Sequence, residues 1–465
     1  MKYVSTRGEA PGADFRTALL AGLAPDGGLY VPEAWPTFSP GEIAAFAGRP
    51  YAETAAAVVG RFTGDAIDPA ALAKICAEAY ATFNHPAVTP LTQLAPGRFL
   101  LELFHGPTLA FKDVAMQLLA RLYDHVLARE GRTLTIVCAT SGDTGGAAVE
   151  AFRGRSNIRI VALFPDGRIS SVQRRYMTTA DDANVACLAV DGTFDDCQAM
   201  LKEMFRDTQF ARAVDLTGVN SINWARIAAQ SVYYFAAAAA LGAPHRKVAF
   251  TVPTGNFGDA FAGFAAHRMG LPIERIVAAV NGNDIIARAF AGGRYARGEV
   301  RATQSPAMDI QVASNFERLY FEAVGRDGAQ TARAFRAFAA QGTIDIPPQA
   351  LEAMRELLSG EAVDETETAS VILSTLNETG NLVDPHTAVG LAAALRTTQD
   401  NPTTPMVVLS TAHPAKFPET VAAAAGVVPP APRWAADLEA RPERFEKAPA
   451  DAEAAKAYIR RFVRA

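Results

Sequence analysis

A ten-residue stretch, FHGPTLAFKD at residues 104–113, decides how the rest of the chain is interpreted. A Gly-Pro turn is followed by four mostly apolar residues and then by Lys112, which opens a helical pattern of apolar side chains. A lysine among apolar neighbours loses solvation of its charged form, so its pKa falls. A neutral amine can attack a carbonyl carbon, and Lys112 is therefore a candidate for covalent attachment of an aldehyde. For an isolated lysine the simpler interpretation is a surface residue in the first turn of a helix.

Two glycine-rich loops favour the chemical interpretation, because each follows an apolar strand pattern and precedes a helical one. The first is residues 140–146 (TSGDTGG), in which Ser141 and Thr144 add hydroxyl donors. The second is residues 253–259 (PTGNFGD). Glycines let the backbone approach a ligand, and the free amides at a helix start favour anions. Either loop alone could be a structural turn, but together with Lys112 they predict cradles for a cofactor phosphate and for a substrate anion.

Residues 220–226 (NSINWAR) form a third candidate element. Arg226 offers a planar fork for a carboxylate or phosphate, and Asn220 and Ser221 are added donors. The alternative is a helix capped by Ser221 and followed by a surface arginine. The residues alone do not decide between the two.

The fourth element is residues 410–417 (STAHPAKF), which follow an apolar strand pattern. Thr411 could direct its hydroxyl at a heteroaromatic nitrogen. Lys416 is a second candidate for aldehyde attachment and ranks below Lys112, because its Pro-Ala setting is typical of a turn. His105 and His413 also lie in turns, where a hydrogen-bonded structural histidine explains them as well as a general base does, so we assign them no catalytic role.

The composition is that of a globular protein that handles small molecules. The 465 residues carry a net charge of −5 and no Lys/Arg-rich block, which argues against nucleic acid as a partner. The N-terminus lacks the apolar run of a secretory signal, and the most apolar segment, residues 232–241, is about half the ~20 residues that span a bilayer. The four cysteines show neither metal-ligand spacing nor a Cys-x-x-Cys pair. We therefore expect a cytoplasmic protein without a metal site.

Short apolar strands alternate with helical patterns from residue 90 onward, which is typical of a parallel sheet covered by helices on both faces. Ligands gather at the carboxyl ends of such strands, where the four elements described above lie. The expected strands are residues 99–103, 134–139, 158–163, 185–190, 248–252, 276–280 and 406–409. The main expected helices are residues 39–46, 51–62, 69–83, 114–128, 146–152, 194–205, 224–241, 260–269, 315–324, 329–340, 348–358 and 451–463.

Five strings of residues together resemble threonine synthases, specifically the longer microbial form. They are residues 26–32 (DGGLYVP), 103–113 (LFHGPTLAFKD), 139–145 (ATSGDTG), 255–259 (GNFGD) and 411–417 (TAHPAKF). The resemblance implies an α/β fold, the two-domain tryptophan synthase β-like fold of pyridoxal-phosphate enzymes, with an N-terminal module. It implies an N-terminal module at 1–84, a large cofactor-binding domain at 85–125 and 215–428, a small domain at 126–214 and a tail at 429–465.

The same resemblance implies roles for individual residues. Lys112 would hold pyridoxal 5'-phosphate covalently, the cofactor phosphate would rest on Gly255, Asn256, Phe257, Gly258 and Asp259, and Thr411 would face the pyridine nitrogen. Asp143 stands where many relatives of the fold have an Asn that contacts the ring hydroxyl, although long threonine synthases share the Asp. Ser141 and Thr144 would receive the substrate carboxylate, and Asn220, Ser221 and Arg226 its phosphate.

The implied reaction converts O-phospho-L-homoserine and water into L-threonine and phosphate. Two alternatives within the fold are a serine or threonine dehydratase, which would lack the phosphate-binding set, and a phospho-lyase that releases phosphate without making threonine. A third, from another class, is a non-catalytic nucleotide-binding module that uses the two glycine loops. We expect no membrane partner, and either a monomer or a homodimer.

Overall fold

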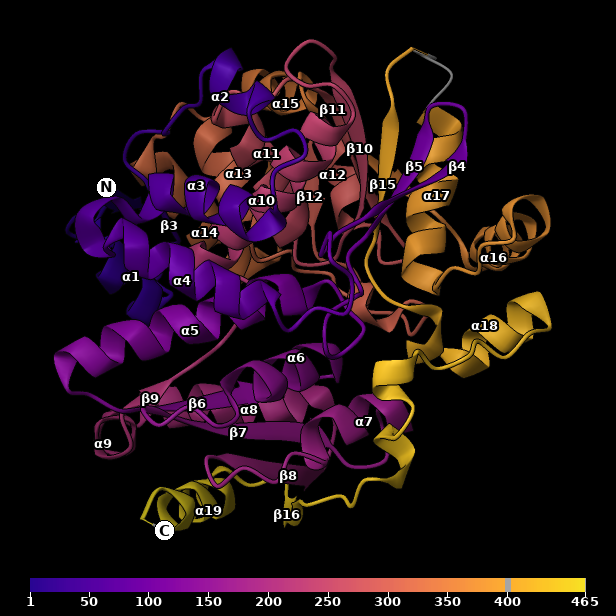
Figure 1. The fold of residues 1–465 in the computed structure, drawn as a ribbon. Helices are drawn as coiled ribbons and strands as arrows, with labels where there is room; N and C mark the ends of the chain where they lie inside the picture. The colour runs from indigo at the N-terminus through magenta and orange to yellow at the C-terminus, as the bar shows by residue number, and fades with distance from the viewer. Residues whose placement is uncertain (398–402, 465) are drawn as a thin grey trace. The chain divides into compact units, whose positions relative to one another are not determined.

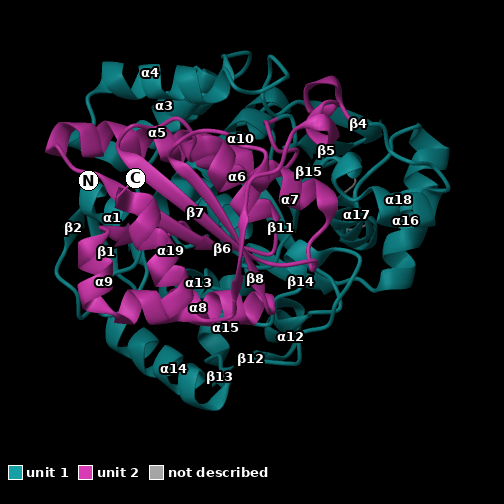
Figure 2. Ribbon diagram, turned by 90° about the horizontal axis from the view of Figure 1, so that it is seen from below, with its two compact units in different colours: residues 1–105, 221–430 teal, residues 106–220, 431–465 magenta. Residues whose placement is uncertain are grey.

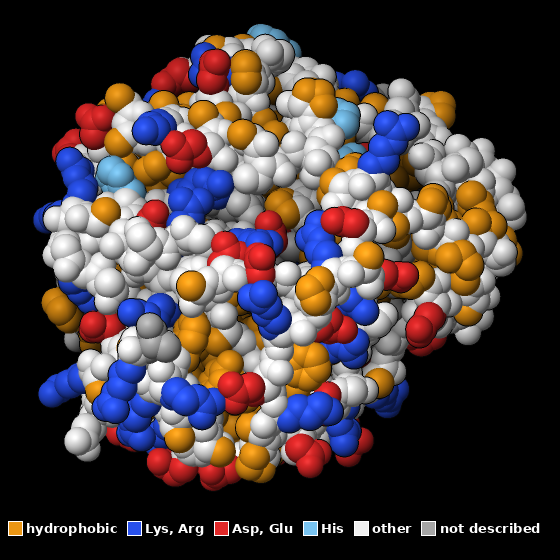
Figure 3. Space-filling model, turned by 60° about the horizontal axis from the view of Figure 1, so that its bottom comes forward, with side chains coloured by type: hydrophobic (Ala, Val, Ile, Leu, Met, Phe, Trp, Pro, Cys, Tyr) orange, Lys and Arg blue, Asp and Glu red, His pale blue; other side chains and the backbone are white. Residues whose placement is uncertain are grey.

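The computed structural model describes residues 1–397 and 403–464, and these form two compact units (Figures 1 and 2). Unit 1 comprises residues 1–105 and 221–430, and unit 2 comprises residues 106–220 and 431–465. Each unit is built around its own parallel sheet, as the alternation of strand and helix patterns predicts. Acidic and basic side chains lie beside one another on the face shown in Figure 3.

The main sheet of unit 1 has the strand order β14-β11-β10-β15-β5-β4. All neighbouring strands are parallel except β4 and β5, which pair antiparallel. The four strands predicted in this unit are confirmed, whereas β4 and β14 were not predicted. The bounds are β4 (Leu91–Ala95), β5 (Arg98–Glu102), β10 (Val248–Pro253), β11 (Ile273–Val280), β14 (Leu358–Ala362) and β15 (Met406–Ser410).

Helices pack on this sheet through apolar side chains. Helix α17 (Pro385–Thr397) packs on β10, β11 and β15 through a cluster that includes Val389 and Ala392. Helix α11 (Gly258–Arg268) packs against β11 and against α10 (Trp224–Ala240). Helix α10 is buried along nearly its whole length, which explains its apolar composition without a membrane. No helix of the described residues is long and apolar enough to span a membrane.

The N-terminal residues belong to the core of unit 1. Strands β1, β2 and β3 form a small antiparallel sheet, and α3 packs against α10. Tyr3 and Phe62 both pack their rings against Trp224 at the start of α10. The bounds are β1 (Lys2–Ser5), β2 (Ala13–Asp14), α1 (Phe15–Ala21), β3 (Tyr30–Pro32), α2 (Pro40–Ala44), α3 (Tyr51–Thr63), η1 (Gly64–Ala66) and α4 (Pro69–Tyr80).

The remainder of unit 1 is mainly helical, as predicted, with a short antiparallel pair of β12 and β13. Its elements are α12 (Ile285–Gly292), β12 (Arg294–Ala296), η2 (Pro306–Met308), α13 (Phe316–Ala323), α14 (Gly328–Gln341), β13 (Thr343–Asp345), α15 (Pro348–Arg355), α16 (Glu365–Thr379), η3 (Pro414–Lys416) and α18 (Pro418–Ala425).

Unit 2 has a five-stranded sheet of order β16-β8-β7-β6-β9, parallel throughout. The C-terminal tail, to which the sequence assigned no role, supplies its edge strand β16 and a helix, α19, whose Ala455 and Ile459 lie in the core. The bounds are α5 (Lys112–Glu130), β6 (Leu134–Ala139), α6 (Asp143–Phe152), β7 (Ile158–Pro165), α7 (Ser171–Thr178), β8 (Val185–Asp191), α8 (Phe194–Arg206), α9 (Thr208–Ala213), β9 (Leu216–Thr217), η4 (Arg433–Ala435), η5 (Leu438–Ala440), β16 (Glu446–Pro449) and α19 (Ala452–Arg464).

The division into 1–84, 85–125 with 215–428, 126–214 and 429–465 stays a prediction. The two compact units are defined by which elements pack together. Helix α5 packs on α6 and strand β9 pairs with β6, so α5 and β9 belong to unit 2.

Candidate active site

A buried carboxylate shapes the turn that precedes Lys112. The Asp113 carboxylate accepts hydrogen bonds from the backbone N–H and the hydroxyl of Thr108, both at 2.7 Å. Gly106 is required in this turn, because a Cβ there would lie 2.5 Å from the Asp113 Cβ. The turn delivers Lys112 as the first residue of α5.

The Lys112 amine faces a carboxylate of the first glycine loop. Its Nζ lies 3.5 Å from Asp143 Oδ2, and the two side chains are 13% and 7% exposed. Gln173 of α7 donates from Nε2 to Asp143 Oδ1 at 3.0 Å, which fixes the carboxylate. The amine is thus largely withdrawn from solvent and oriented by an acidic partner. Gln173 was missed in the sequence; it is the N3 residue of a Ser170-x-x-Gln173 capping box at the start of α7, a spacing that marks a helix start but not the contact with Asp143.

Thr140 holds the first glycine loop in shape. Its hydroxyl oxygen accepts from the amides of Gly142 and Gly145, both at 2.9 Å. Gly142 has φ 131°, and a Cβ there would lie 2.6 Å from the Gln173 side chain. Within this loop Ser141 is exposed and Thr144 is half-buried. Their hydroxyls are therefore accessible to a ligand.

Asn220 lies at the same edge of the unit 2 sheet as the glycine loop. The loop follows β6, Asn220 follows β9, and these two strands are parallel neighbours. Asn220 is exposed. Unit 2 therefore brings together Lys112, Asp143, the loop hydroxyls and Asn220.

The second glycine loop, in unit 1, presents a row of backbone amides. It joins β10 to α11, and Phe257 takes a left-handed conformation (φ 62°) as the N-cap residue of α11. Within the described part of the chain, no group accepts a hydrogen bond from the amides of residues 255–258, the amide row. A Cβ on Gly255 would lie 3.0 Å from the Ala307 carbonyl oxygen. This arrangement fits a phosphate group, which several convergent amides can bind.

Asn315, which the sequence patterns did not indicate, braces the amide row from the start of α13. Its backbone N–H and its Nδ2 donate to the Asn256 carbonyl at 3.0 and 3.1 Å, and Nδ2 also lies 3.2 Å from the Ser221 carbonyl. One buried amide side chain therefore joins two of the segments singled out in the sequence.

The Asp259 carboxylate lies away from the amide row. Its Oδ1 accepts from the hydroxyls of Tyr233 and Tyr234 on α10, the latter at 3.0 Å. Burial raises the pKa of Asp259 to about 7. Any contribution of Asp259 to anion binding therefore comes from its backbone.

Helix α10 is not capped by Ser221, and Arg226 is not a surface residue. The N-cap is Asn223, whose side chain accepts from the Ala225 amide at 3.0 Å and donates to the Leu19 carbonyl at 2.7 Å. Arg226 is 4% exposed. The structural alternative from the sequence is therefore wrong on both points, because the N-terminal residues cover the start of α10.

Thr411 follows β15, the parallel neighbour of β10, so it lies at the same sheet edge as the amide row. It is 5% exposed. Lys416, in the short helix η3 that follows Thr411, is also buried.

The two histidines of these segments have structural surroundings. His105 pairs with Glu102 at 2.7 Å. Burial lowers the pKa of His413 to about 4.

Within the described residues, no group of three or more His, Cys, Asp or Glu side chains could hold a metal ion. The donors are instead a largely buried lysine beside a carboxylate, hydroxyls on a loop at a helix start, and a row of backbone amides. These residue types suit an aldehyde that carries a phosphate.

The class of protein is indicated by three features: two sheets of mainly parallel strands, a lysine at a helix start, and a row of amides suited to a phosphate. Residues 83–412 match the family described as pyridoxal-phosphate dependent enzymes. Residues 2–80 match the threonine synthase N terminus, and residues 387–459 match the threonine synthase C-terminal family. The chain belongs to the threonine synthase family.

Individual relatives agree over the whole length. The chain is 49% identical to the threonine synthase of Pseudomonas aeruginosa over 460 residues, covering 99% of this chain and 98% of that one. The crystal structure of a PLP-bound threonine synthase from Brucella melitensis is 54% identical, with a TM-score of 0.98 and full coverage of both chains. The yeast threonine synthase structure is 36% identical with a TM-score of 0.94, covering 100% of this chain and 99% of that one.

Proposed function

We propose that this chain is a threonine synthase that converts O-phospho-L-homoserine and water into L-threonine and phosphate with pyridoxal 5'-phosphate as cofactor. The observation that carries the proposal is the likeness to threonine synthases over the whole chain, N-terminal residues included. The other lyases considered above would share only the central cofactor-binding part of that likeness. The lysine and hydroxyls of unit 2, and the row of amides in unit 1, are the kinds of group that this cofactor and substrate require.

The bound cofactor supplies an electron sink for loss of protons from carbons near the amino group. Lys112 would hold it covalently, and the Lys112 amine would also serve as the base that moves protons at Cα and Cβ of the substrate. The Asp143 carboxylate, 3.5 Å from Nζ, orients the lysine, and Gln173 holds Asp143 in place. The pair thus keeps one amine in position through attachment and proton transfer.

In unit 1, the cofactor phosphate would be held by the backbone amides of Gly255, Asn256, Phe257, Gly258 and Asp259. The inward turn of the Asp259 carboxylate toward α10 keeps a negative charge off that phosphate. Thr411 would offer a hydroxyl to the pyridine nitrogen, and a hydroxyl does not force that nitrogen to be protonated as a carboxylate would. This suits elimination and replacement at the substrate side chain.

The substrate groups are assigned by charge and donor type. Ser141 and Thr144 receive the carboxylate on the accessible hydroxyls of the first glycine loop. Asn220, Ser221 and Arg226 bind the phosphate, and they stabilise its charge as it leaves Cγ. Selection for a phosphorylated substrate follows from the same contacts.

A coupled assay tests the proposal. Purified full-length protein, saturated with pyridoxal 5'-phosphate, is given O-phospho-L-homoserine, and threonine and phosphate are both quantified. We expect equal amounts of the two products. Phosphate accompanied by 2-oxobutyrate would indicate a phospho-lyase, and turnover of serine or threonine without phosphate release would indicate a dehydratase. A colourless protein that takes up no cofactor would favour the binding module.

We also propose that the enzyme works in the cytoplasm as a monomer or homodimer. All four cysteines are buried free thiols, which suits a reducing compartment. Size-exclusion chromatography with light scattering would establish the oligomeric state.

A further inference from the structure

Arg318, on the first turn of α13, is a fully buried arginine that donates only to neutral acceptors. It is 0% exposed. Its Nε donates to the Tyr30 carbonyl at 3.0 Å, Nη2 to the Ile222 carbonyl at 2.6 Å, and Nη1 to Asn315 Oδ1. Its guanidinium also lies 5.5 Å from the centre of the Trp224 ring. Every strong donor contact therefore goes to a carbonyl oxygen.

The positive charge of Arg318 is not balanced by a carboxylate of its own. Among the described residues none forms an ion pair with it. The adjacent Glu317 is already paired with Arg7, at 3.0 Å, and accepts from Thr6. The one carboxylate next to Arg318 in the sequence is thus engaged by another arginine, and Arg318 leaves an excess positive charge in the interior. Burial lowers the pKa of Arg318 to about 9, so it is still charged at neutral pH.

A buried charge without a counter-charge is unfavourable, so a fold that keeps one is expected to use it. The contacts of Arg318 show where it acts. It holds the carbonyl of Ile222, beside Ser221, and it holds Asn315, which in turn binds the carbonyls of Ser221 and Asn256. Asn315 Nδ2 would lie 3.2 Å from a Cβ on Gly258, so it sits against the amide row itself.

We propose that Arg318, acting through Asn315, positions the phosphate-binding backbone of unit 1 and supplies the buried positive charge that complements a bound phosphate monoester. Arg318 is a positioning residue, because its own donors are used within the protein. The inference rests on the proposed function for the identity of the phosphate. That phosphate belongs to the cofactor or to the substrate, and these are separated below.

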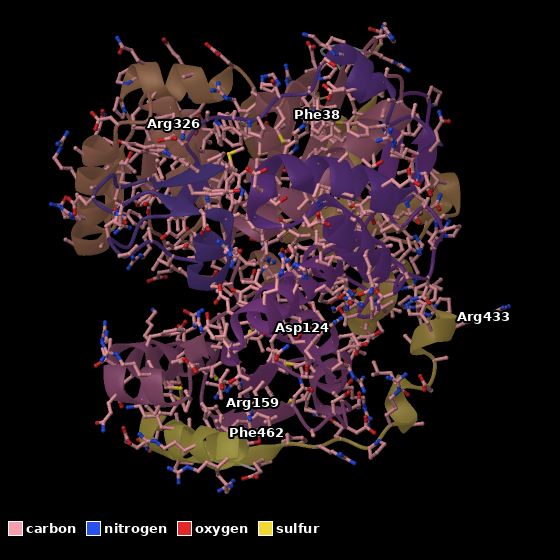
Figure 4. All side chains as sticks on the ribbon, turned by 60° about the vertical axis from the view of Figure 1, so that its left-hand side comes forward. Phe38, Asp124, Arg159, Arg326, Arg433 and Phe462 are labelled. Carbon is pink, nitrogen blue, oxygen red and sulfur yellow. The ribbon has the colours of Figure 1, made fainter. Side chains whose placement is uncertain are left out.

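The competing explanation is a structural brace for strand β3, whose Tyr30 carbonyl Arg318 holds. Arg326 provides a matched control in the same unit (labelled in Figure 4). It donates to the Pro32 carbonyl of the same strand at 2.5 Å, but it has a carboxylate partner, Glu322, at 3.1 Å. Arg326→Met therefore removes a similar brace without removing an unbalanced charge.

The experiment compares ligands that differ only in their phosphate. Dissociation constants of pyridoxal 5'-phosphate and of pyridoxal are measured on the full-length chain of wild type, Arg318→Met, Arg318→Lys and Arg326→Met. The KM and kcat for O-phospho-L-homoserine are measured at saturating cofactor. We expect Arg318→Met to raise one of two constants by at least about tenfold. The constant is either the dissociation constant of pyridoxal 5'-phosphate or the KM for O-phospho-L-homoserine, the latter with kcat nearly unchanged. The affected constant identifies which phosphate is complemented.

We expect binding of pyridoxal to change less than about twofold, Arg326→Met to behave as wild type, and Arg318→Lys to recover most of the lost affinity because it keeps the charge. Equal weakening of pyridoxal and its phosphate, or unchanged affinity for both phosphorylated compounds, would overturn the inference. If Arg318→Met does not fold, Asn315→Asp replaces it, since it adds a negative charge at nearly constant shape and should weaken the same constants. The cofactor constants need no turnover, so they remain informative even if no threonine is made.

Discussion

Asp259 illustrates how a residue within a motif can serve the fold instead of the ligand. Its place in the GNFGD string suggests a polar contact to the cofactor, yet its side chain is buried between two tyrosine hydroxyls of α10. Because a buried carboxyl is more stable when neutral, its protonation is linked to folding.

This linkage predicts a pH-dependent stability. The folded pKa is about 7, whereas that of an unfolded Asp is ~3.9. Between these values the folded state keeps a proton that the unfolded state releases, so the stability from this group falls as pH rises, by up to about 1.4 kcal/mol per pH unit. The melting temperature of wild type minus that of Asp259→Asn should therefore fall from pH 5 to 7 and level off above.

Glu42→Gln is the control for this measurement. Hydrogen bonds from Ser39 lower the pKa of Glu42, so it is ionised throughout this range and its difference from wild type should stay flat. A flat difference for Asp259→Asn as well would show that Asp259 is ionised in the folded protein.

Arg226 is the second test at the residue scale. Truncating an arginine that binds a buried phosphate typically costs ~2–5 kcal/mol, so Arg226→Ala should raise KM for O-phospho-L-homoserine by at least about tenfold. Steady-state kinetics at saturating cofactor measures this, with Arg226→Lys to show how much the charge alone restores. A KM near that of wild type for Arg226→Ala would remove this residue from the substrate site.

Single-residue chemistry was only partly predictable. Residue types on the loops indicated Lys112, the glycines and Thr411 as candidates, and these occupy helix starts and strand ends as expected. The partners that fix them, Gln173 and Asn315, lie far along the chain in otherwise ordinary helix starts. No local pattern reports such a contact, because tertiary packing alone creates it.

At the scale of elements, the amide row depends on close packing around its first glycine. A Cβ on Gly255 would lie 2.9 Å from Ile310 Cδ1, 3.0 Å from the Ala307 oxygen and 3.2 Å from Met308 Cα. Backbone atoms cannot move aside as a flexible side chain can. The loop from β10 to α11 would shift instead.

Gly255→Ala should therefore weaken the binding of pyridoxal 5'-phosphate at least about tenfold, since a displacement of about 1 Å is costly in a site that depends on exact positioning. Gly282→Ala is the matched control: Gly282 follows the neighbouring strand β11, and a Cβ there meets nothing within 4 Å. Spectroscopic titration of the full-length variants gives both constants. Equal affinities for the two variants would show that the amide row does not bind the cofactor.

Apolar strands were predictable, whereas polar ones were not. The strands of the two sheet centres are runs of Val, Ile, Leu and Ala, which burial on both faces requires. Strands β14 (LSGEA) and β16 (EKAP) have no such run, and their pairing is set by neighbours already in place. The alternative in which Ser221 caps α10 was also wrong. Asn223 is the N-cap, because its side chain is held in place by a hydrogen bond to the Leu19 carbonyl.

At the scale of the molecule, each unit has its own core, and the C-terminal tail completes that of unit 2. Ile459 of α19 is fully buried with residues of β7, β8 and α8. Ile459→Ala should cost about 2–5 kcal/mol through the cavity it leaves. Hydrogen exchange should then accelerate in β7 and β8, with β10 and β11 of unit 1 unaffected.

Leu373→Ala on α16 serves as the control, because Leu373 is 41% exposed and its loss should change stability by less than about 0.5 kcal/mol. Accelerated exchange in both units for Ile459→Ala would contradict independent cores. The sequence predicted parallel sheets, but it did not indicate that a tail rich in Pro and Ala returns to one of them.

The central claim is the covalent attachment of the cofactor at Lys112. Borohydride reduction of the cofactor-loaded full-length protein, followed by peptide mass spectrometry, tests it most directly. The account predicts one reduced pyridoxyl-phosphate adduct, on the peptide that contains Lys112, and none in Lys112→Arg. An adduct on Lys416, or no adduct in a protein that binds the cofactor, would contradict it.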